Sequence, residues 1–413
     1  MKRQLLPINN LLPAALSLIV AISPLSAVSS EQEHLSEQLS EQLCSTCHKI
    51  GNLERSSGYS KEHWQTLTSY MLNSANPQIS NELSEYLANK YPVNDKRASK
   101  VVDGDIKLQI KYWQVPTLGQ RARDPVQGKD GIIWWVGQWG NILGRLDPVS
   151  GKMKEYTLPA GTYPHSVTLD ENLTPWFLGN KNGTVGYLDL NSEQFKVFNM
   201  PNEKARDPHT GVFDKNGMFW FTLQHSNMIG KLNPKNGDIQ LVSLPTKKSK
   251  PYGIKIDSTG TPWVSCNGSN CLVKVDKNTM ALEEIKLPGE KTHARRLAIT
   301  PKDVVYYVNS GMGKLGRYDP ATGKITEWDS PSGRDSHPYA IEYADGAIWF
   351  NESAKRPETL VRFDLTTETM QSWQIPSKEG VYSGLIRHMR MGNKGLMIHQ
   401  TATNQLAEIT WSK

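Results

Sequence analysis

The sequence predicts an all-β seven-bladed β-propeller preceded by a small all-α domain. The first observation is an aromatic pair that recurs along most of the chain at a nearly constant interval. Its first members step by 42, 44, 43, 43 and 43 residues: Trp134, Trp176, Trp220, Trp263, Tyr306 and Trp349. A repeat of this length that holds four short strands is typical of propeller blades. We therefore expect the aromatic residues to pack between neighbouring blades.

Two further motifs divide each repeat into strands. After the aromatic pair comes a segment with glycine at its second position, such as residues 143–147 (LGRLD) or 229–233 (IGKLN). A pair ending in proline, such as Leu158-Pro159 or Leu244-Pro245, then closes the unit. These motifs predict four strands per unit, which we call a to d.

The seventh unit is incomplete at the C-terminus. It starts near Tyr382 and ends its third strand at residues 406–409. Residues 112–116 (YWQVP) match the fourth strand of the preceding unit, residues 372–376 (SWQIP). We therefore predict that strand 110–116 completes the last blade and closes a propeller of residues 108–413.

Basic and aromatic side chains gather at one end of the predicted ring, where strands a begin and strands b end. The histidines there are His165, His209, His225, His293, His337, His388 and His399. The arginines and tyrosines are Arg123, Arg206, Arg295, Arg334, Arg387, Tyr252 and Tyr339. This clustering predicts a basic funnel that binds a small polar or anionic ligand. The alternative is that these side chains cap strand ends.

Cys266 and Cys271 flank residues 267–270 (NGSN) on one turn between strands b and c. In an oxidising compartment we expect a local disulfide across this turn. A catalytic thiol is the less favoured alternative, and no Ser-His-Asp triad is recognised in order or context.

The N-terminus has the composition of a secretory signal at residues 1–29. Lys2 and Arg3 precede an apolar run over residues 11–22, and small residues follow near Ala27. The run is short and broken by proline, so cleavage is expected rather than a membrane span, with an uncleaved anchor as the alternative. We therefore expect a periplasmic mature chain. The net charge is +6 with no Lys/Arg block, so nucleic-acid binding is not indicated.

Residues 44–48 (CSTCH) carry the C-x-x-C-H signature of covalent c-type haem. Cys44 and Cys47 would form the thioethers, and His48 would be the proximal iron ligand. The alternative is a zinc or thioredoxin-like pair, but zinc needs further Cys or His ligands at close spacing, and none follow. We therefore predict one haem c and a mono-haem cytochrome c domain at residues 30–92.

The sequence predicts three helices in this domain, at residues 35–43, 61–72 and 81–91. Trp64, Leu67 and Met71 share one face of the second helix. Met71 is the candidate sixth ligand of the haem iron, His63 is the runner-up, and an open site is the third possibility. The pattern resembles small mono-haem cytochrome c domains attached to dehydrogenases. Residues 93–107 are polar and aperiodic, which predicts a linker.

The repeats of residues 108–413 resemble the streptogramin B (virginiamycin B) lyase family. The matching segments are residues 250–254 (KPYGI), 345–350 (DGAIWF), 141–147 (NILGRLD) and 155–159 (EYTLP). The resemblance implies a propeller that opens a cyclic depsipeptide by elimination, with a His base and a magnesium ion held by Glu.

The catalytic motif of that family is only partly matched here. Its Glu-Pro-His segment corresponds to His337-Pro338-Tyr339, and its later Glu corresponds to Glu352, one residue early. His337 and Glu352 are therefore the residues that carry over, with Asp335 as the nearest second carboxylate. Since Mg²⁺ prefers carboxylate oxygens, the departures weaken the expectation of magnesium.

Two functional hypotheses follow. The first is a periplasmic oxidoreductase, in which the haem exchanges electrons with a donor or acceptor protein while the funnel binds or oxidises the substrate. The residues expected to bind the substrate are His209, His337, Arg295, Arg334 and Tyr339. The second is a lyase-like enzyme with His337 as base, Glu352 as acid or metal ligand and Arg295 as oxyanion stabiliser. A binding module with an accessory haem is a further alternative. Because of the haem motif, the first hypothesis is preferred from the sequence alone.

Overall fold

The computed structural model describes residues 37–38, 40–42, 53, 57–72, 77–376 and 385–413. The chain divides into two compact units, residues 1–50 and 51–413. Of the first unit, residues 37–38 and 40–42 are helical. The second unit contains α3 (Lys61–Leu72), α4 (Pro77–Lys90), two short 3₁₀ segments, η2 (Asp95–Arg97) and η3 (Arg334–Ser336), and strands β1 to β28.

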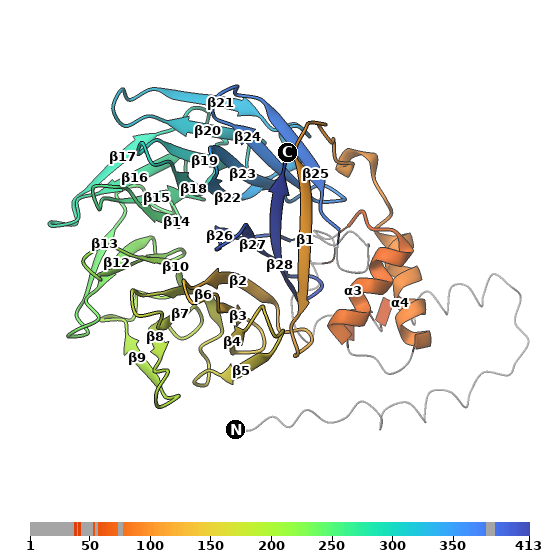
Figure 1. Ribbon diagram of the computed structural model, residues 1–413, viewed down its shortest axis with the longest axis horizontal. Helices are drawn as coiled ribbons and strands as arrows, with labels where there is room; N and C mark the ends of the chain where they lie inside the picture. Colours follow the sequence, from red (N-terminus) through yellow and green to blue (C-terminus); the bar gives the residue numbers. More distant parts are fainter. Residues whose placement is uncertain (1–36, 39, 43–52, 54–56, 73–76, 377–384) are drawn as a thin grey trace, which may run out of the picture. The chain divides into compact units, whose positions relative to one another are not determined.

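The strands form seven four-stranded antiparallel sheets arranged as the blades of a ring, as predicted (Figure 1). Blade 1 consists of β2 (Ala122–Gln127), β3 (Ile133–Gly137), β4 (Ile142–Leu146) and β5 (Met153–Thr157). Blade 2 consists of β6 (Pro164–Leu169), β7 (Pro175–Gly179), β8 (Thr184–Leu188) and β9 (Phe195–Asn199). Blade 3 consists of β10 (Pro208–Phe213), β11 (Phe219–Leu223), β12 (Met228–Leu232) and β13 (Ile239–Ser243).

The remaining blades repeat this pattern. Blade 4 consists of β14 (Pro251–Ile256), β15 (Pro262–Cys266), β16 (Cys271–Val275) and β17 (Leu282–Lys286). Blade 5 consists of β18 (Ala294–Ile299), β19 (Val305–Asn309), β20 (Lys314–Tyr318) and β21 (Ile325–Asp329). Blade 6 consists of β22 (Pro338–Ala344), β23 (Ala347–Glu352), β24 (Thr359–Asp364) and β25 (Met370–Gln374). Blade 7 consists of β26 (Met389–Met391), β27 (Leu396–Gln400), β28 (Gln405–Ser412) and β1 (Lys107–Gln114).

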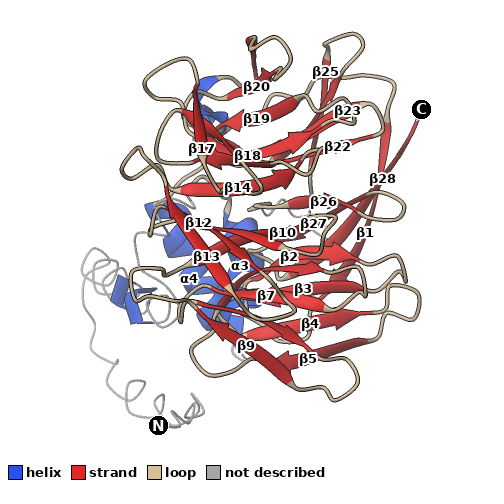
Figure 2. Ribbon diagram, turned by 90° about the vertical axis from the view of Figure 1, so that its left-hand side faces the viewer, coloured by secondary structure: helices blue, strands red, loops and turns tan. Residues whose placement is uncertain are grey.

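The ring is closed by the first strand of the propeller. Strand β1 pairs along its whole length with β28, from Lys107 opposite Ser412 to Gln114 opposite Gln405 (Figures 1 and 2). This pairing confirms the prediction that the N-terminal strand supplies the fourth strand of the last blade. Blade 7 is thus built from both ends of the propeller sequence.

The repeated aromatic residues fill the space between blades. Trp220 of blade 3 packs with Ile254 and Val264 of blade 4 in one buried cluster. The second aromatic of the pair lies over the glycine of the next strand, so that Phe221 is opposite Gly230. A Cβ atom on Gly230 would lie 2.3 Å from Cζ of Phe221, which is closer than van der Waals contact allows. This contact explains the glycine of the repeat motif.

The two helices α3 and α4 each bury an apolar face. Trp64 and Leu67 of α3 and Leu83 and Leu87 of α4 are almost fully buried. The bounds of α3 agree with the prediction, whereas α4 starts four residues earlier than expected, at Pro77. Proline is tolerated there because the first turn of a helix needs no donor from its N–H. In the described part of the chain, the helices are too short or too polar to span a membrane.

The polar segment that follows α4 is bound along blade 6. The backbone N–H and C=O groups of Val102 bond to Ser372, and Ile106 exchanges two hydrogen bonds with the Gln371 side chain. Arg356 donates its backbone N–H to Arg97 at 2.7 Å and places its guanidinium 4.8 Å from the ring centroid of Tyr59. The predicted linker is therefore fixed to the propeller over residues 97–106.

Candidate functional site

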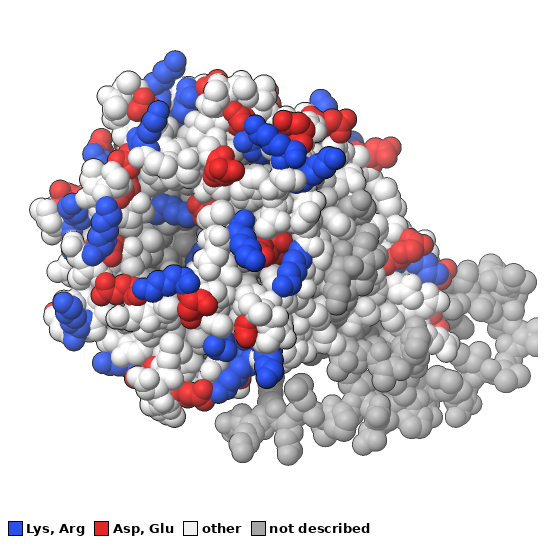
Figure 3. All heavy atoms as spheres, in the orientation of Figure 1, with Lys and Arg blue, Asp and Glu red and all other residues white. Residues whose placement is uncertain are grey.

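The site is built at the centre of the ring, where the seven innermost strands come together. These strands are β2, β6, β10, β14, β18, β22 and β26. His165, His209, His337 and His388 lie at or next to their starts, and His399 lies at the end of β27, which is the same end of the ring. The face shown in Figure 3 is the opposite one, where these inner strands end; it is hollowed in the middle, and Lys or Arg atoms border the hollow.

A break in strand register near the start of each long inner strand shapes this site. The register shifts between Pro208 and Gly211 in β10 and between Ala294 and Leu297 in β18, with equivalent shifts in β2, β6, β14 and β22. In a regular strand, successive side chains point to opposite faces. A bulge removes this alternation. Neighbours such as Arg295 and Arg296 therefore reach the same aromatic ring, that of Tyr252, at 5.4 and 5.2 Å from its centroid.

The partly exposed layer of the site contains Tyr339, Arg295 and His337. The guanidinium of Arg295 lies 4.4 Å from the ring centroid of Tyr339, and the hydroxyl groups of Tyr339 and Tyr252 are hydrogen-bonded to each other. Arg295 also donates from Nε to Oγ of Ser310 at 3.0 Å, and its Nη2 approaches Nε2 of His337 at 3.4 Å. Three predicted catalytic residues thus meet at the rim of the channel.

The arginines set the protonation of these groups. Burial alone would raise the pKa of Tyr339, but the charges of Arg295, Arg296 and Arg123 lower it below the ordinary tyrosine value. Burial raises the pKa of Tyr252 to about 12, so Tyr252 stays a neutral donor to its neighbour. Burial and the charge of Arg295 lower the pKa of His337 to about 4, so His337 is neutral at pH 7 and a weak base.

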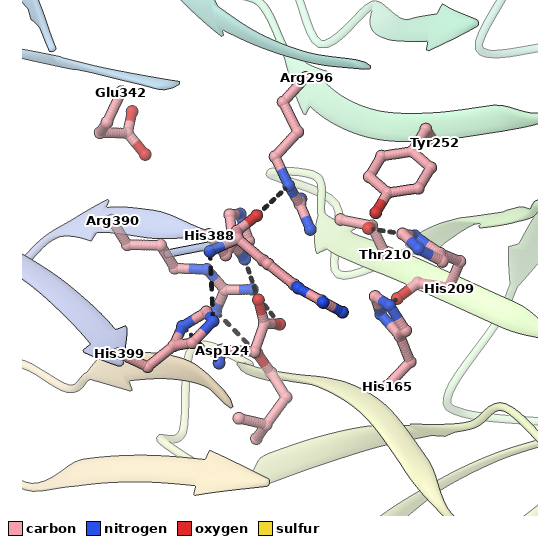
Figure 4. A network of polar contacts seen from close by, with 12 residues as sticks. Asp124, His165, His209, Thr210, Tyr252, Arg296, Glu342, His388, Arg390 and His399 are labelled. Carbon is pink, nitrogen blue, oxygen red and sulfur yellow. Dashed lines mark hydrogen bonds and ion pairs between the residues drawn. The ribbon is translucent and has the colours of Figure 1, made fainter. Parts of the chain in front are cut away.

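A buried layer lies below, and its centre is Asp124 (Figure 4). Nδ1 of His388 is hydrogen-bonded to the Asp124 carboxylate, and Arg390 donates to it from Nη2 at 3.2 Å. Burial alone would raise the pKa of Asp124, but the contacts with His388 and Arg390 lower it far below the ordinary value. Asp124 is therefore an anion that neutralises part of the positive charge of the channel.

Four histidines of this buried layer are held neutral. Burial and nearby arginines lower the pKa of His165, His209, His388 and His399 well below the usual histidine value. The rings of His165 and His209 lie 3.6 Å apart between centroids, and Nδ1 of His165 bonds to the backbone oxygen of His209 at 2.7 Å. His209 also packs on Tyr252, with 4.0 Å between ring centroids. The predicted residue His209 is thus joined to Tyr339 through Tyr252.

Glu352 is turned away from this cluster. Its carboxylate accepts hydrogen bonds from the backbone N–H of Ser332 at 2.8 Å, from the Ser332 hydroxyl at 2.6 Å and from the Thr359 hydroxyl at 2.5 Å. Among the described residues, no group of three His, Cys, Asp or Glu side chains is placed to hold a metal ion. The donor set therefore does not fit a magnesium ion held by Glu352, and the roles predicted for this residue gain no support from its contacts.

The remaining predicted residues lie elsewhere. The sulfur atoms of Cys266 and Cys271 approach to 2.6 Å across the β15–β16 turn, with both residues present as free thiols, so the disulfide stays a prediction. Arg206, Arg334, His225 and His293 are exposed at the rim. Cys44, Cys47 and His48 fall outside the described residues, as does the side chain of Met71.

Sequence reasoning missed three charged residues of the channel: Asp124, Arg296 and Arg390. The predicted funnel residues stood at strand starts, whereas Arg390 lies within β26 and Asp124 and Arg296 follow Arg123 and Arg295 directly. In a regular strand, Asp124 would point to the face opposite Arg123, and Arg296 to the face opposite Arg295. The positive φ of Asp124, 59°, belongs to the bulge that brings it inward and has no signature in the sequence.

The fold and the site define a seven-bladed propeller with a basic, tyrosine-containing central channel. The profile of the virginiamycin B lyase family matches residues 93–275. The chain is similar to the crystal structure of virginiamycin B lyase from Staphylococcus aureus, with 20% identity, a TM-score of 0.66 and coverage of 74% of this chain and 99% of that one. A streptogramin B lyase structure has 22% identity, a TM-score of 0.66 and coverage of 74% and 98%.

A more distant likeness is to the extracellular domain of a one-component system from B. thetaiotaomicron, with 14% identity, a TM-score of 0.55 and coverage of 73% and 40%. No curated protein matches the chain significantly.

These comparisons support a virginiamycin B lyase-like propeller. They correct the order of the two hypotheses from the sequence, because they favour the lyase-like alternative, whereas haem electron transfer finds no support in them or in the described residues. At 20–22% identity, the solved structures establish the fold alone, so the chemistry has to be argued from the site.

Proposed function

We propose that the channel catalyses a lyase-type elimination on a substrate that contains an ester, with Tyr339 as the base. The observation that carries this proposal is the surroundings of Tyr339. Its hydroxyl accepts a hydrogen bond from Tyr252, its ring is covered by Arg295 at 4.4 Å, and its pKa is lowered by three arginines although burial acts in the opposite direction. A base with a pKa closer to neutrality is more effective at physiological pH.

The elimination is balanced without a further reactant. Tyr339 removes a proton from the carbon next to a carbonyl group, and the electron pair left on that carbon forms a C=C bond as the neighbouring C–O bond of the ester breaks. The leaving group is a carboxylate, and Arg295 donates to the oxygen on which its charge develops. A cyclic ester would be opened by this step. Arg295 is positioned for this role by Ser310 and by His337.

His337 has a positioning role in this scheme. Its Nδ1 bonds to Oγ of Ser353 at 2.9 Å, and that hydroxyl also bonds to the backbone oxygen of His337 at 2.7 Å. With a pKa of about 4, neutral His337 removes protons poorly and does not repel the guanidinium beside it. Within the lyase-like hypothesis, the sequence named His337 as the base, whereas the contacts favour Tyr339.

The test uses the purified full chain with a streptogramin B depsipeptide and with smaller esters that carry an acidic hydrogen next to the carbonyl. Mass spectrometry would detect an unsaturated product whose total mass equals that of the substrate. Tyr339→Phe should lower kcat by about 10²- to 10⁴-fold with little change in thermal stability. Tyr163→Phe, at an exposed tyrosine, is the control. Full activity of Tyr339→Phe would refute the assignment of the base.

A covalent haem c in the N-terminal region is a second proposal, favoured by the C-x-x-C-H motif of Cys44, Cys47 and His48. The buried indole N–H of Trp64 makes no hydrogen bond within the described part of the chain, so an acceptor group of a bound cofactor would satisfy it. A bound haem would supply one-electron chemistry. A pyridine haemochrome spectrum of periplasmically expressed protein tests the proposal, and Met71→Ala should keep the haem but shift the spectrum. Absence of a haemochrome would refute it.

A further inference from the structure

Arg123 presents an unused hydrogen-bonding edge inside the channel. Its side chain is about 2% exposed, and only Nη1 has a partner, Oε1 of Gln138 at 2.7 Å. Nε and Nη2 are buried and have no hydrogen-bond partner among the described residues. These two nitrogens lie on the same side of the planar guanidinium, and their N–H groups form the parallel fork that binds the two oxygens of a carboxylate.

The guanidinium of Arg123 lies near the axis of the ring. Its charge acts on His165 of blade 2, His209 of blade 3, Tyr252 of blade 4 and Tyr339 of blade 6, although Arg123 belongs to blade 1. Electrostatic effects of this kind fade with distance, so a group that affects four other blades must be central. The unused edge therefore belongs to the same channel as Tyr339.

Arg296 adds a second unused donor from the opposite side. Its Nε donates to the backbone oxygen of Arg387 at 2.7 Å, while its Nη2 is buried without a partner among the described residues. Figure 4 shows Arg296 pointing into the space between Tyr252 and His388. Arg123 and Arg296 interact electrostatically, which places their guanidinium groups close to each other.

The carboxylates of the channel already have hydrogen-bonded partners. Asp124 holds His388 and Arg390, and Glu342 accepts a hydrogen bond from Nζ of Lys255 at 2.6 Å. Within the described chain, no salt bridge joins Arg123 or Arg296 to a carboxylate. Two buried cations without a paired anion are costly for a folded protein, because burial removes the water that stabilises their charge. This arrangement indicates that a ligand supplies the anion.

We propose that Arg123, through Nε and Nη2, and Arg296, through Nη2, bind a carboxylate group of the substrate, which is therefore an organic acid. The inference rests on the site of the proposed function and narrows its substrate class. The ester to be cleaved would sit at Tyr339 and Arg295, and the free carboxylate would lie deeper, on the arginine pair. An uncharged cyclic depsipeptide would leave this pair unused and would be a poor substrate.

Binding of a simple dicarboxylate tests the inference without requiring any reaction. Isothermal titration calorimetry of the full chain with succinate, at constant ionic strength, should show binding at one site. Succinamide, which has the same shape but no charge, should bind at least about tenfold more weakly. Sulfate, which is tetrahedral, should also bind more weakly than succinate. Equal binding of sulfate and succinate, or no binding of succinate, would overturn the carboxylate assignment.

Matched arginine variants locate the site. Arg123→Lys keeps the charge but removes the fork, so it should weaken succinate binding by about tenfold or more, and Arg296→Lys should weaken it less. Arg206→Lys, at an exposed arginine on the same end of the ring, should leave the Kd unchanged. An unchanged Kd in both channel variants would refute the proposal.

A measurement on the unmodified protein covers the case in which Arg123→Lys does not fold. An anion bound beside Tyr339 opposes its ionisation, so succinate binding near pH 9 should be accompanied by proton uptake, measured by repeating the titration in buffers of different ionisation enthalpy. No proton uptake would place the anion elsewhere. Tyr339→Phe should still bind succinate, so a failure of the elimination and a failure of the carboxylate site give different results.

Discussion

Asp124→Asn is expected to destabilise the propeller through charge rather than through shape. Asn has nearly the same size, and it tolerates the positive φ of 59° at this position. The change removes the anion that holds His388 and Arg390. Loss of one partner of a buried ion pair costs about 3–5 kcal/mol, and because Asn retains an acceptor oxygen for His388 we expect about 3 kcal/mol.

Urea unfolding followed by tryptophan fluorescence provides the assay, since the chain has 12 tryptophans. Asp345→Asn is the matched control, because Asp345 also has a positive φ, 50°, but lies at an exposed turn, and we expect it to cost less than about 0.5 kcal/mol. A loss of less than about 1 kcal/mol in Asp124→Asn would refute the view that Asp124 neutralises the buried cations.

The same comparison has a defined pH dependence. The pKa of Asp124 is lowered by folding, so its stabilising contribution is complete above the unfolded value, near 4, and is lost as the pH falls below it. The difference in the free energy of unfolding between the wild type and Asp124→Asn should therefore be constant from pH 7 to 5 and shrink towards pH 3. A difference that stays constant at pH 3 would contradict this account.

Three further predictions follow from the packing and the charges. The four buried histidines of the channel are neutral in the folded protein, so the free energy of unfolding should fall as the pH drops below about 6.5. The expected loss is up to about 1.4 kcal/mol per pH unit for each histidine. His209→Gln should reduce this slope when unfolding is measured over a series of acidic pH values. Gly230→Ala should cost about 1–3 kcal/mol in urea unfolding because its Cβ would lie 2.3 Å from Phe221, and adding Phe221→Leu should restore part of the loss. Cys266 and Cys271 should form a disulfide in periplasmically expressed protein. The number of free thiols from this pair should then rise only after reduction. Free thiols of Cys266 and Cys271 before reduction would exclude the disulfide.

The ring and its closure could be predicted because they depend on a repeated pattern. The aromatic pairs, the glycine of each third strand and the match of residues 112–116 to residues 372–376 are visible without coordinates. The position of Tyr339, Arg295 and His337 at one end of the ring also followed from the order of the strands. These features result from periodicity, which a single sequence contains.

The internal geometry of the site could not be predicted in the same way. Whether Arg296 points into the channel depends on a bulge in β18, and whether Glu352 faces His337 depends on Ser332 and Thr359 reaching its carboxylate first. Both outcomes are set by contacts between segments distant in the sequence or by a local break in register. The assignment of Tyr339 as base, instead of His337, likewise depends on three charges that converge from two other blades.

The seam between β1 and β28 has a consequence for how the protein is made. The two strands are separated by about 300 residues, so at a synthesis rate of about 5–20 residues per second β1 waits roughly 15–60 s for its partner. Until β28 emerges, blade 7 lacks its third strand and β1 has no strand to pair with, so His388, Arg390 and His399 have no finished sheet to hold them against Asp124. Only a chain translated to its final strand can assemble the channel, so truncated products should be inactive as well as unstable.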